Sequence, residues 1–181
     1  RPTWPRAITP HGFFVTSTDT GVGKTLVACA LLRAFAAAGR RVAGMKPVAA
    51  GADESAEGLI NADVQLLRAA SSVAAPLALV NPYCFKPPVA PHIAAEQAGV
   101  TIDLERIAQA FAQLAAVADV VIVEGVGGFC VPLNCHEDAA DLARRLALPV
   151  ILVVGLRLGC LNHALLTAQA VRARGLRLAG W

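Results

Sequence analysis

Short apolar runs alternate along this chain with longer stretches of helical periodicity, and Gly, Pro, Asn or Asp stand at most of the junctions. The short runs predict strands, at about residues 12–17, 41–46, 119–124, 149–155 and 176–181. The longer stretches predict helices, at about residues 24–38, 60–70, 103–117, 138–147 and 160–174. Strands that alternate with helices indicate an α/β fold, a three-layer sandwich whose mainly parallel sheet has helices on both faces.

The polar positions refine this picture in two places. Residues 120–123 and 150–154 are unbroken aliphatic runs, as expected of parallel strands that are buried on both faces. Residues 71–100 interrupt the alternation instead, and the part between 81 and 92 contains too many prolines for a central strand. Because a long ordered loop is usually functional or a linker, we predict a loop near the site in this segment.

One junction has the layout of a phosphate-binding loop. The apolar strand that ends near Val15 leads through small residues into a helix that opens with Lys24 and Thr25. Backbone N–H groups of such a loop close around phosphate oxygens, and the positive end of the helix dipole faces them. Lys24 would contact the β- and γ-phosphates, and the Thr25 hydroxyl would hold Mg²⁺. The strict pattern G-x-x-x-x-G-K-[ST] requires glycine where this chain has Thr18, so a chance Gly-Lys-Thr is the alternative.

Charged residues at the other strand ends would converge on the same place, because ligands of open parallel sheets bind beyond the carboxyl ends of the strands. Lys46 follows the second predicted strand, where a buried lysine requires a negative ligand or a structural ion pair. Glu124 ends the third, and its carboxylate suits Mg²⁺, with a helix cap or salt bridge as the alternative. Asp63 is a weaker candidate, since acidic residues in a first helical turn usually compensate the dipole. These residues predict a P-loop NTPase-like site for Mg²⁺ with ATP or GTP, and leave the acceptor open.

Composition narrows the partners and the compartment. The net charge is only +3, and the arginines are spread along the chain without a basic cluster, so we expect no nucleic-acid partner. No apolar run approaches the roughly 18 residues that span a membrane, so we expect no membrane association. Five scattered cysteines, an odd number, favour a reducing compartment, the cytoplasm.

The length of 181 residues predicts one domain. We expect it to span residues 12–181, after a Pro-rich, disordered or clipped leader at 1–11. The chain stops inside the last predicted strand, so we expect this domain to be truncated at its C-terminus.

Seven blocks of this sequence together resemble the dethiobiotin synthetase family of biotin biosynthesis. They follow one another from about residue 12 to 181, at residues 18–25, 43–48, 61–63, 80–83, 90–92, 123–128 and 158–167. The phosphate-loop block is common to many families. The Lys-Pro-Val, Asn-Pro-Tyr and Leu-Gly-Cys-x-Asn-His-Ala blocks are far more specific.

The resemblance implies an ATP- and Mg²⁺-dependent ligase. That family closes 7,8-diaminopelargonate and CO₂ (or bicarbonate) into the ureido ring of dethiobiotin, and ATP becomes ADP and phosphate. A carbamate forms on one substrate nitrogen, is phosphorylated to a mixed anhydride, and is then attacked by the other nitrogen. The resemblance also implies a homodimer with the substrate at the subunit interface.

The same resemblance implies roles for individual residues. Three would be catalytic, namely Lys24, Lys46 and Thr20. Eight would bind the nucleotide, namely Thr20, Gly21, Val22, Gly23, Lys24, Thr25, Glu124 and Gly127. Three would be the Mg²⁺ ligands, namely Thr25, Asp63 and Glu124. Four would contact the diamine substrate, namely Lys46, Ala50, Leu161 and Asn162, the last two from the neighbouring chain.

The chain departs from the family pattern in two places, and the family's adenine-reading segment lies beyond Trp181. Ser17 stands where glycine is usual, which removes the freedom to adopt positive φ. Ala50 stands where serine is common, so a hydroxyl contact to the substrate would be absent, at about 1 kcal/mol.

Three other classes remain as alternatives. Partitioning-type switch ATPases carry an extra lysine early in the loop, which residues 18–20 do not supply. Amidating synthetases of cobalamin assembly usually carry a glutaminase domain, for which this chain is too short. A non-catalytic remnant is the third alternative.

Overall fold

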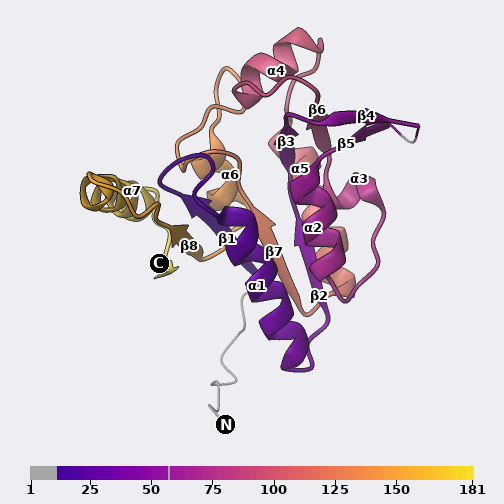
Figure 1. Ribbon diagram of the computed structural model, residues 1–181, viewed down its shortest axis with the longest axis horizontal. Helices are drawn as coiled ribbons and strands as arrows, with labels where there is room; N and C mark the ends of the chain where they lie inside the picture. Colours follow the sequence, from indigo (N-terminus) through magenta and orange to yellow (C-terminus); the bar gives the residue numbers. More distant parts are fainter. Residues whose placement is uncertain (1–11, 57) are drawn as a thin grey trace.

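A five-stranded parallel sheet forms the centre of the computed structural model, which describes residues 12–56 and 58–181. Its strands, in spatial order, are β2 (Val42–Met45), β7 (Val120–Glu124), β1 (Gly12–Ser17), β8 (Val150–Val153) and β9 (Leu178–Gly180) (Figure 1). Every neighbouring pair in this sheet is parallel. The leader expected at residues 1–11 lies outside the described residues.

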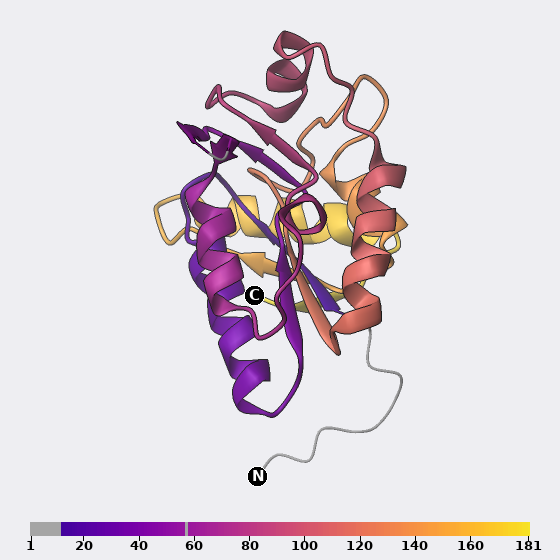
Figure 2. The same cartoon turned by 90° about the vertical axis from the view of Figure 1, so that its right-hand side faces the viewer.

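Helices cover both faces of this sheet. On one face lie α1 (Lys24–Ala37) and α2 (Ala62–Ala70), and on the other lie α5 (Leu104–Val117) and α6 (Ala139–Arg145) (Figure 2). Successive residues of β1 pack into the two separate cores, Phe14 with Ile107 and Leu142, and Val15 with Leu32. The last helix, α7 (Cys160–Ala173), contacts β8 and β9. None of the described helices is long and apolar enough to cross a membrane.

Short elements form a further layer beyond the carboxyl ends of the sheet strands (Figure 1). There β3 (Val48–Ala50) pairs in parallel with β6 (Tyr83–Phe85), and β4 (Asp53–Ser55) pairs antiparallel with β5 (Gly58–Ile60). Two short helices belong to the same stretch of chain, α3 (Leu77–Val80) and α4 (Pro91–Gln97).

The three-layer α/β prediction with a mainly parallel sheet is confirmed. The prediction of a plain loop at 71–100 is wrong, because this segment contains α3, β6 and α4. Its prolines fit the elements they flank, since Pro91 occupies the first turn of α4, where no backbone donor is needed. The strands β3 to β6 were missed because three residues are too few to establish an alternating pattern.

The start of α2 also differs from the prediction. The helix begins at Ala62 rather than near residue 60, because Asn61 caps it. The Asn61 side-chain oxygen accepts hydrogen bonds from the backbone N–H groups of Asp63 and Val64, at 3.1 and 3.4 Å. This cap fixes Asp63 in the first helical turn, which faces the site described next.

Candidate functional site

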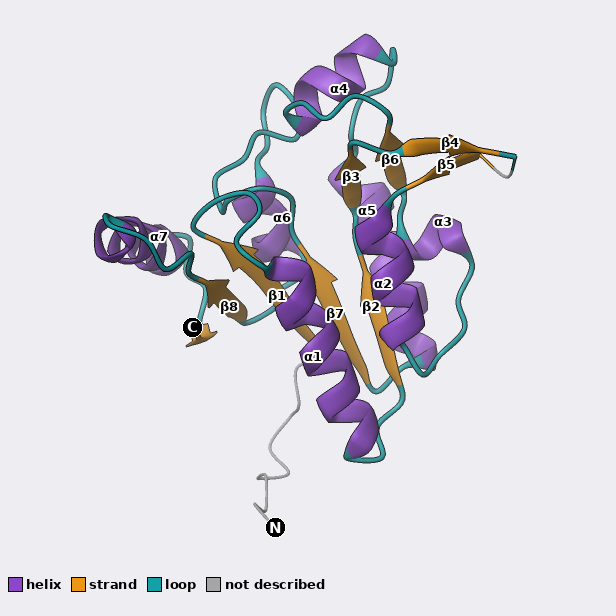
Figure 3. Cartoon of the chain, in the orientation of Figure 1, coloured by secondary structure: helices purple, strands orange, loops and turns teal. Residues whose placement is uncertain are grey.

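The loop between β1 and α1, residues 18–23, lies at the carboxyl end of the central strand (Figure 3). Gly21 and Gly23 adopt φ angles of 74° and 100°, in the left-handed region that glycine enters without steric cost. Thr18, where the strict pattern has glycine, instead accepts a hydrogen bond from the Gly155 N–H at 3.1 Å. This segment is called the phosphate loop below.

Ser17 does not adopt positive φ, so the conformational freedom that glycine would bring is not used at this position. Ser17 is the last residue of β1, and among the described residues Ala147 is the sole non-glycine with positive φ. The Ser17 hydroxyl accepts a hydrogen bond from Lys24 Nζ at 3.0 Å and lies within reach of the Asp19 and Gly127 carbonyl oxygens. Burial lowers the pKa of the Lys24 ammonium, and the charge of Lys46 adds to this effect. Lys24, which follows the phosphate loop, is thus held by Ser17, a neutral partner that precedes the loop.

Four side chains from four elements meet beside the phosphate loop. Lys46 Nζ contacts Glu124 Oε1 at 2.6 Å and Asp63 Oδ2 at 2.8 Å. The Thr25 hydroxyl donates to the same Glu124 Oε1 at 2.9 Å. Thr25, Lys46, Asp63 and Glu124 are called the carboxylate–lysine cluster below. The three predicted Mg²⁺ ligands therefore lie in one hydrogen-bonded group, together with the predicted catalytic Lys46.

Burial makes this cluster electrostatically strong. Glu124 is 0% exposed and Lys46 is 5% exposed, so neither charge is solvated and each depends on its partner. Burial alone would raise the pKa of the Asp63 carboxyl. The Lys46 ammonium and the Thr25 hydroxyl outweigh that effect and hold the pKa below its ordinary value. The buried Glu124 carboxylate thus depends on a cation beside it, and the partly exposed Asp63 shares that cation, the Lys46 ammonium.

The donor set fits a hard divalent cation. Mg²⁺ prefers oxygen ligands and commonly uses one or two carboxylates together with phosphate oxygens and water. Glu124 Oε2 is buried without a hydrogen-bond partner among the described residues, so it has an unused lone pair. Within the same described ranges no group of three His, Cys, Asp or Glu side chains could hold a metal ion, so this site offers two carboxylates and a hydroxyl. Thr25, Asp63 and Glu124 are therefore the best candidates to hold Mg²⁺ here.

Two of the remaining predicted residues, Thr20 and Ala50, lie at the carboxyl-end side of the sheet, and two others lie on α7. Thr20 lies beside Gly127, because a Cβ added at Gly127 would be 3.7 Å from the Thr20 hydroxyl oxygen. Ala50 is the half-buried end of β3, in the layer beyond the sheet.

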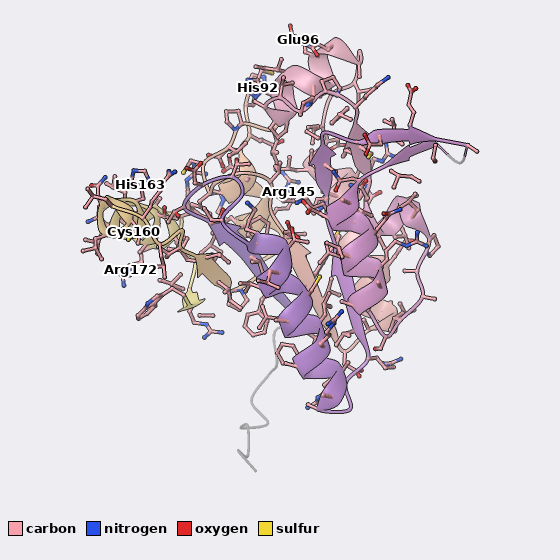
Figure 4. All side chains as sticks on the ribbon, viewed as in Figure 1. His92, Glu96, Arg145, Cys160, His163 and Arg172 are labelled. Carbon is pink, nitrogen blue, oxygen red and sulfur yellow. The ribbon has the colours of Figure 1, made fainter. Side chains whose placement is uncertain are left out.

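Leu161 and Asn162 lie elsewhere, near the start of α7 between Cys160 and His163 (Figure 4). Because α7 packs on β8 and β9, at the opposite end of the strand order from β2, they are not brought to Lys46 within one chain.

Two features of the site were missed in the sequence. One is the Ser17 hydroxyl as the partner of Lys24. The other is an ion pair between Asp19 of the phosphate loop and Arg157, which precedes α7. The backbone N–H of Thr20 and then the Arg157 guanidinium lower the pKa of Asp19. The sequence indicated this pair only through the opposite charges of two loops that follow β1 and β8, strands that the structure shows to be adjacent.

The fold and this site define a P-loop nucleotide-binding protein. A family model described as an AAA domain matches residues 11–181. ATP-dependent dethiobiotin synthetase BioD from Nitrosospira multiformis is 61% identical over 170 residues, which cover 94% of this chain and 74% of that protein. The enzyme of the same name from Aromatoleum aromaticum is 62% identical over 172 residues, 95% of this chain and 76% of that protein. The chain belongs to the dethiobiotin synthetase family, as its motifs predicted.

Solved structures agree at the level of the fold. The kinase domain of Escherichia coli tyrosine kinase ETK superposes with a TM-score of 0.55 at 15% identity, covering 96% of this chain and 67% of that one. The BceF tyrosine kinase domain gives a TM-score of 0.51 at 19% identity, covering 94% of this chain and 66% of that one. At these identities the likeness concerns the fold alone.

Proposed function

We propose that this chain catalyses the ATP-dependent closure of 7,8-diaminopelargonate and CO₂ to dethiobiotin, with release of ADP and phosphate. The relatives that carry this name match the chain over more than nine-tenths of its length. The observation that carries the chemistry is the carboxylate–lysine cluster beside Lys24, where two ammonium groups and two carboxylates meet at the phosphate loop.

The reaction needs three bond-forming steps. One substrate amine attacks CO₂ and loses a proton, which gives a carbamate. A carbamate oxygen then attacks the γ-phosphorus of ATP, the bond to the β-phosphate oxygen breaks, and ADP leaves. The second amine attacks the carbonyl carbon of this mixed anhydride and loses a proton, and phosphate leaves with the electrons of the C–O bond.

The residues of this chain would act mainly on charge. Lys24 and Lys46 would neutralise the γ-phosphate and the carbamate, whose negative charges otherwise repel each other. Gly21, Val22 and Gly23 would present backbone N–H groups to the phosphates, and Thr20 would line the pocket beside Gly127. Ala50 would face the substrate without a hydrogen bond.

Mg²⁺ would be held by Thr25, Asp63 and Glu124, and when bound with ATP it would neutralise charge on the phosphates. The support is the donor set described above, above all the unused Glu124 Oε2. The five free cysteines support the cytoplasm as the compartment.

We also propose a homodimer in which Leu161 and Asn162 reach the substrate bound to the other chain. The support is the surface of α7, where Leu161 and Leu165 are 77% and 65% exposed beside an apolar cavity of about 390 Å³. Mixing Lys46→Met protein with Asn162→Ala protein tests this. Activity should reappear, because a mixed dimer has one site with both residues intact. No recovery, with mixed dimers present by native mass spectrometry, would contradict the shared site.

The reaction is tested by phosphate release from Mg²⁺–ATP and bicarbonate, with and without the diamine, and by mass spectrometry of the product. We expect release that depends on the diamine and matches dethiobiotin one to one. Diamine-independent release would favour a switch ATPase, and no release would favour a non-catalytic relative.

A further inference from the structure

We propose that Lys46 is an internal counter-ion that occupies the metal position until Mg²⁺ arrives with ATP. On this view the Lys46 ammonium holds Glu124 and Asp63 in place in the resting protein and is displaced toward the phosphates on loading. The inference rests on the proposed metal role of these two carboxylates, and its test does not depend on turnover.

The geometry of the cluster places the ammonium between the carboxylates. Lys46 Nζ is 2.6 Å from Glu124 Oε1 and 2.8 Å from Asp63 Oδ2. A cation that bound the same two oxygens at the 2.0–2.1 Å typical of Mg²⁺ would lie in the space that Nζ fills. The Thr25 hydroxyl is committed to Glu124 Oε1 as well, at 2.9 Å. Thr25 Oγ1, Asp63 Oδ2 and Glu124 Oε1 are therefore all engaged, the last two by the lysine itself, and Glu124 Oε2 is the oxygen that stays free of partners among the described residues.

The charges lead to the same conclusion. Glu124 is 0% exposed, so a carboxylate there without a cation would carry the full cost of a buried unpaired charge. Lys46 supplies that cation, but a divalent ion that enters alongside the ammonium meets repulsion beside the buried Glu124, where little water screens the charges. ATP removes the conflict, since its phosphates supply negative charge to which Lys46 can move. Mg²⁺ alone should consequently bind weakly, and Mg²⁺ with nucleotide should bind well.

The other two lysines of the sequence do not compete in this way. Lys24 donates to the neutral Ser17 hydroxyl and leaves the carboxylates free. Lys86 pairs with Glu54 on the surface, where the two side chains are 62% and 71% exposed. A lysine suits the role of a displaceable counter-ion because its compact ammonium sits on a flexible four-carbon stem.

The test measures binding of Mn²⁺, a Mg²⁺ substitute visible by electron paramagnetic resonance, to the nucleotide-free protein. Lys46→Met removes the competing charge and keeps the apolar stem, and Lys46→Gln is a second neutral variant. We expect Mn²⁺ to bind either variant about tenfold more tightly than the wild type, which corresponds to about 1.4 kcal/mol. Lys86→Met is the matched control and should bind Mn²⁺ as the wild type does.

Thermal unfolding supplies a second readout. The metal-free Lys46 variants should unfold at a lower temperature than the wild type, and Mn²⁺ should raise their midpoint more than that of the wild type. Equal or weaker Mn²⁺ affinity in folded Lys46 variants would overturn the proposal. If dethiobiotin forms while these affinities are unchanged, the counter-ion idea fails and the proposed reaction stands. If the variants bind Mn²⁺ more tightly but the wild type forms no dethiobiotin, the counter-ion proposal stands and the proposed reaction fails.

A measurement on the wild type covers the case in which neither variant folds. NMR of the side-chain ammonium groups needs to resolve only three lysines, and Lys86→Met identifies one of them. Adding Mg²⁺ with a non-hydrolysable ATP analogue should shift the resonance of the carboxylate-bound ammonium and leave that of Lys86 unchanged. An unchanged Lys46 resonance at saturating nucleotide would overturn the proposal.

Discussion

The phosphate loop and the carboxylate–lysine cluster are neighbours in space, but they are assembled in opposite ways. The loop takes its shape mainly from residues 17–25, through two left-handed glycines and the Ser17 hydroxyl that holds Lys24. Distant residues add contacts at its edge, from Gly155 to Thr18 and from Arg157 to Asp19. The cluster draws its side chains from α1, from α2, from the end of β7 and from the residue that follows β2. Strand order brings two of them together, because Met45 is in register with Val123 and the next residues are Lys46 and Glu124.

The phosphate loop therefore depends mainly on neighbouring residues in the sequence, and the cluster depends on the whole fold. The loop is a backbone structure that tolerates Ser17 and Thr18 because the residues that need positive φ are Gly21 and Gly23. The cluster is a set of buried charges that balance one another, so a change in one of them alters all the others. Substitutions in the cluster should therefore act mainly on chemistry and metal binding, and substitutions in the loop on nucleotide affinity.

The largest effect is expected from Glu124→Gln, which removes one of the two carboxylates of the cluster. We expect kcat to fall by a factor of about 10² to 10³, as for loss of one preorganised electrostatic group, with ATP affinity within a few-fold. Steady-state kinetics and nucleotide binding by calorimetry measure the two effects. Glu54→Gln removes a carboxylate from an exposed ion pair and should leave both unchanged. Equal losses in the two variants would mean that membership of the cluster does not set the effect.

The next effect concerns the packing of the loop against β8. A Cβ at Gly155 would lie 2.6 Å from Val22 Cγ1, so Gly155→Ala should push the phosphate loop out of position. Overpacking of this kind costs about 1–3 kcal/mol, and we expect ATP to bind about tenfold more weakly. Adding Val22→Ala makes room for the new methyl group and should restore binding. Failure of the double variant to recover would mean that the loop does not depend on this contact.

A smaller effect is expected from Ser17→Ala, which removes the acceptor that holds Lys24. One such hydrogen bond contributes about 1 kcal/mol, so KM for ATP should rise a few-fold. The affinity for Mn²⁺ should not change, because Ser17 does not contact the carboxylates. Thr167→Ala, which removes a hydroxyl that donates to the His163 carbonyl oxygen within α7, serves as the control in the same assays. A change in Mn²⁺ affinity would show that loop and cluster are coupled through Lys24.

The smallest effect lies away from both regions, at the amino end of the sheet. Hydrogen bonds from the Arg41 side chain and backbone hold the pKa of the Asp119 carboxyl below its ordinary value. A carboxyl whose pKa is lowered on folding stabilises the protein at pH values above its unfolded pKa of about 3.9. That stabilisation is lost as the pH falls through the folded-state pKa.

Asp119→Asn should therefore lower the unfolding midpoint by about one or two degrees at pH 7, and by less at pH 3. Thermal scans at the two pH values measure this. A difference that grows toward low pH would contradict the assigned direction.

The sequence predicted the local and periodic parts of this molecule. Continuous apolar runs gave β7 and β8, and the Gly-Lys-Thr signature gave the start of α1, because these signals lie within a few neighbouring residues. The three-residue strands β3 to β6 carry no such signal, and their pairing depends on contacts between distant segments.

The site divides in the same way. Glu124 and Lys46 could be proposed from their places at strand ends, but their mutual contact follows from strand order and register. From its position alone Asp63 was a weak candidate, because a first-turn carboxylate is common. The family resemblance named it as a metal ligand, and the contact with Lys46 brings it into the cluster. The Arg157–Asp19 pair joins residues 138 positions apart and had no local signal.

An oxygen label shows whether this site joins CO₂ to the diamine through a phosphorylated carbamate. The carbamate oxygen that attacks the γ-phosphorus stays on phosphorus when the ring closes, so it leaves with the phosphate. With ¹⁸O-labelled CO₂ and a reaction shorter than its exchange with water, mass spectrometry should find one ¹⁸O in each phosphate formed together with dethiobiotin. Phosphate that carries no label, released at the same rate as the product, would contradict the account.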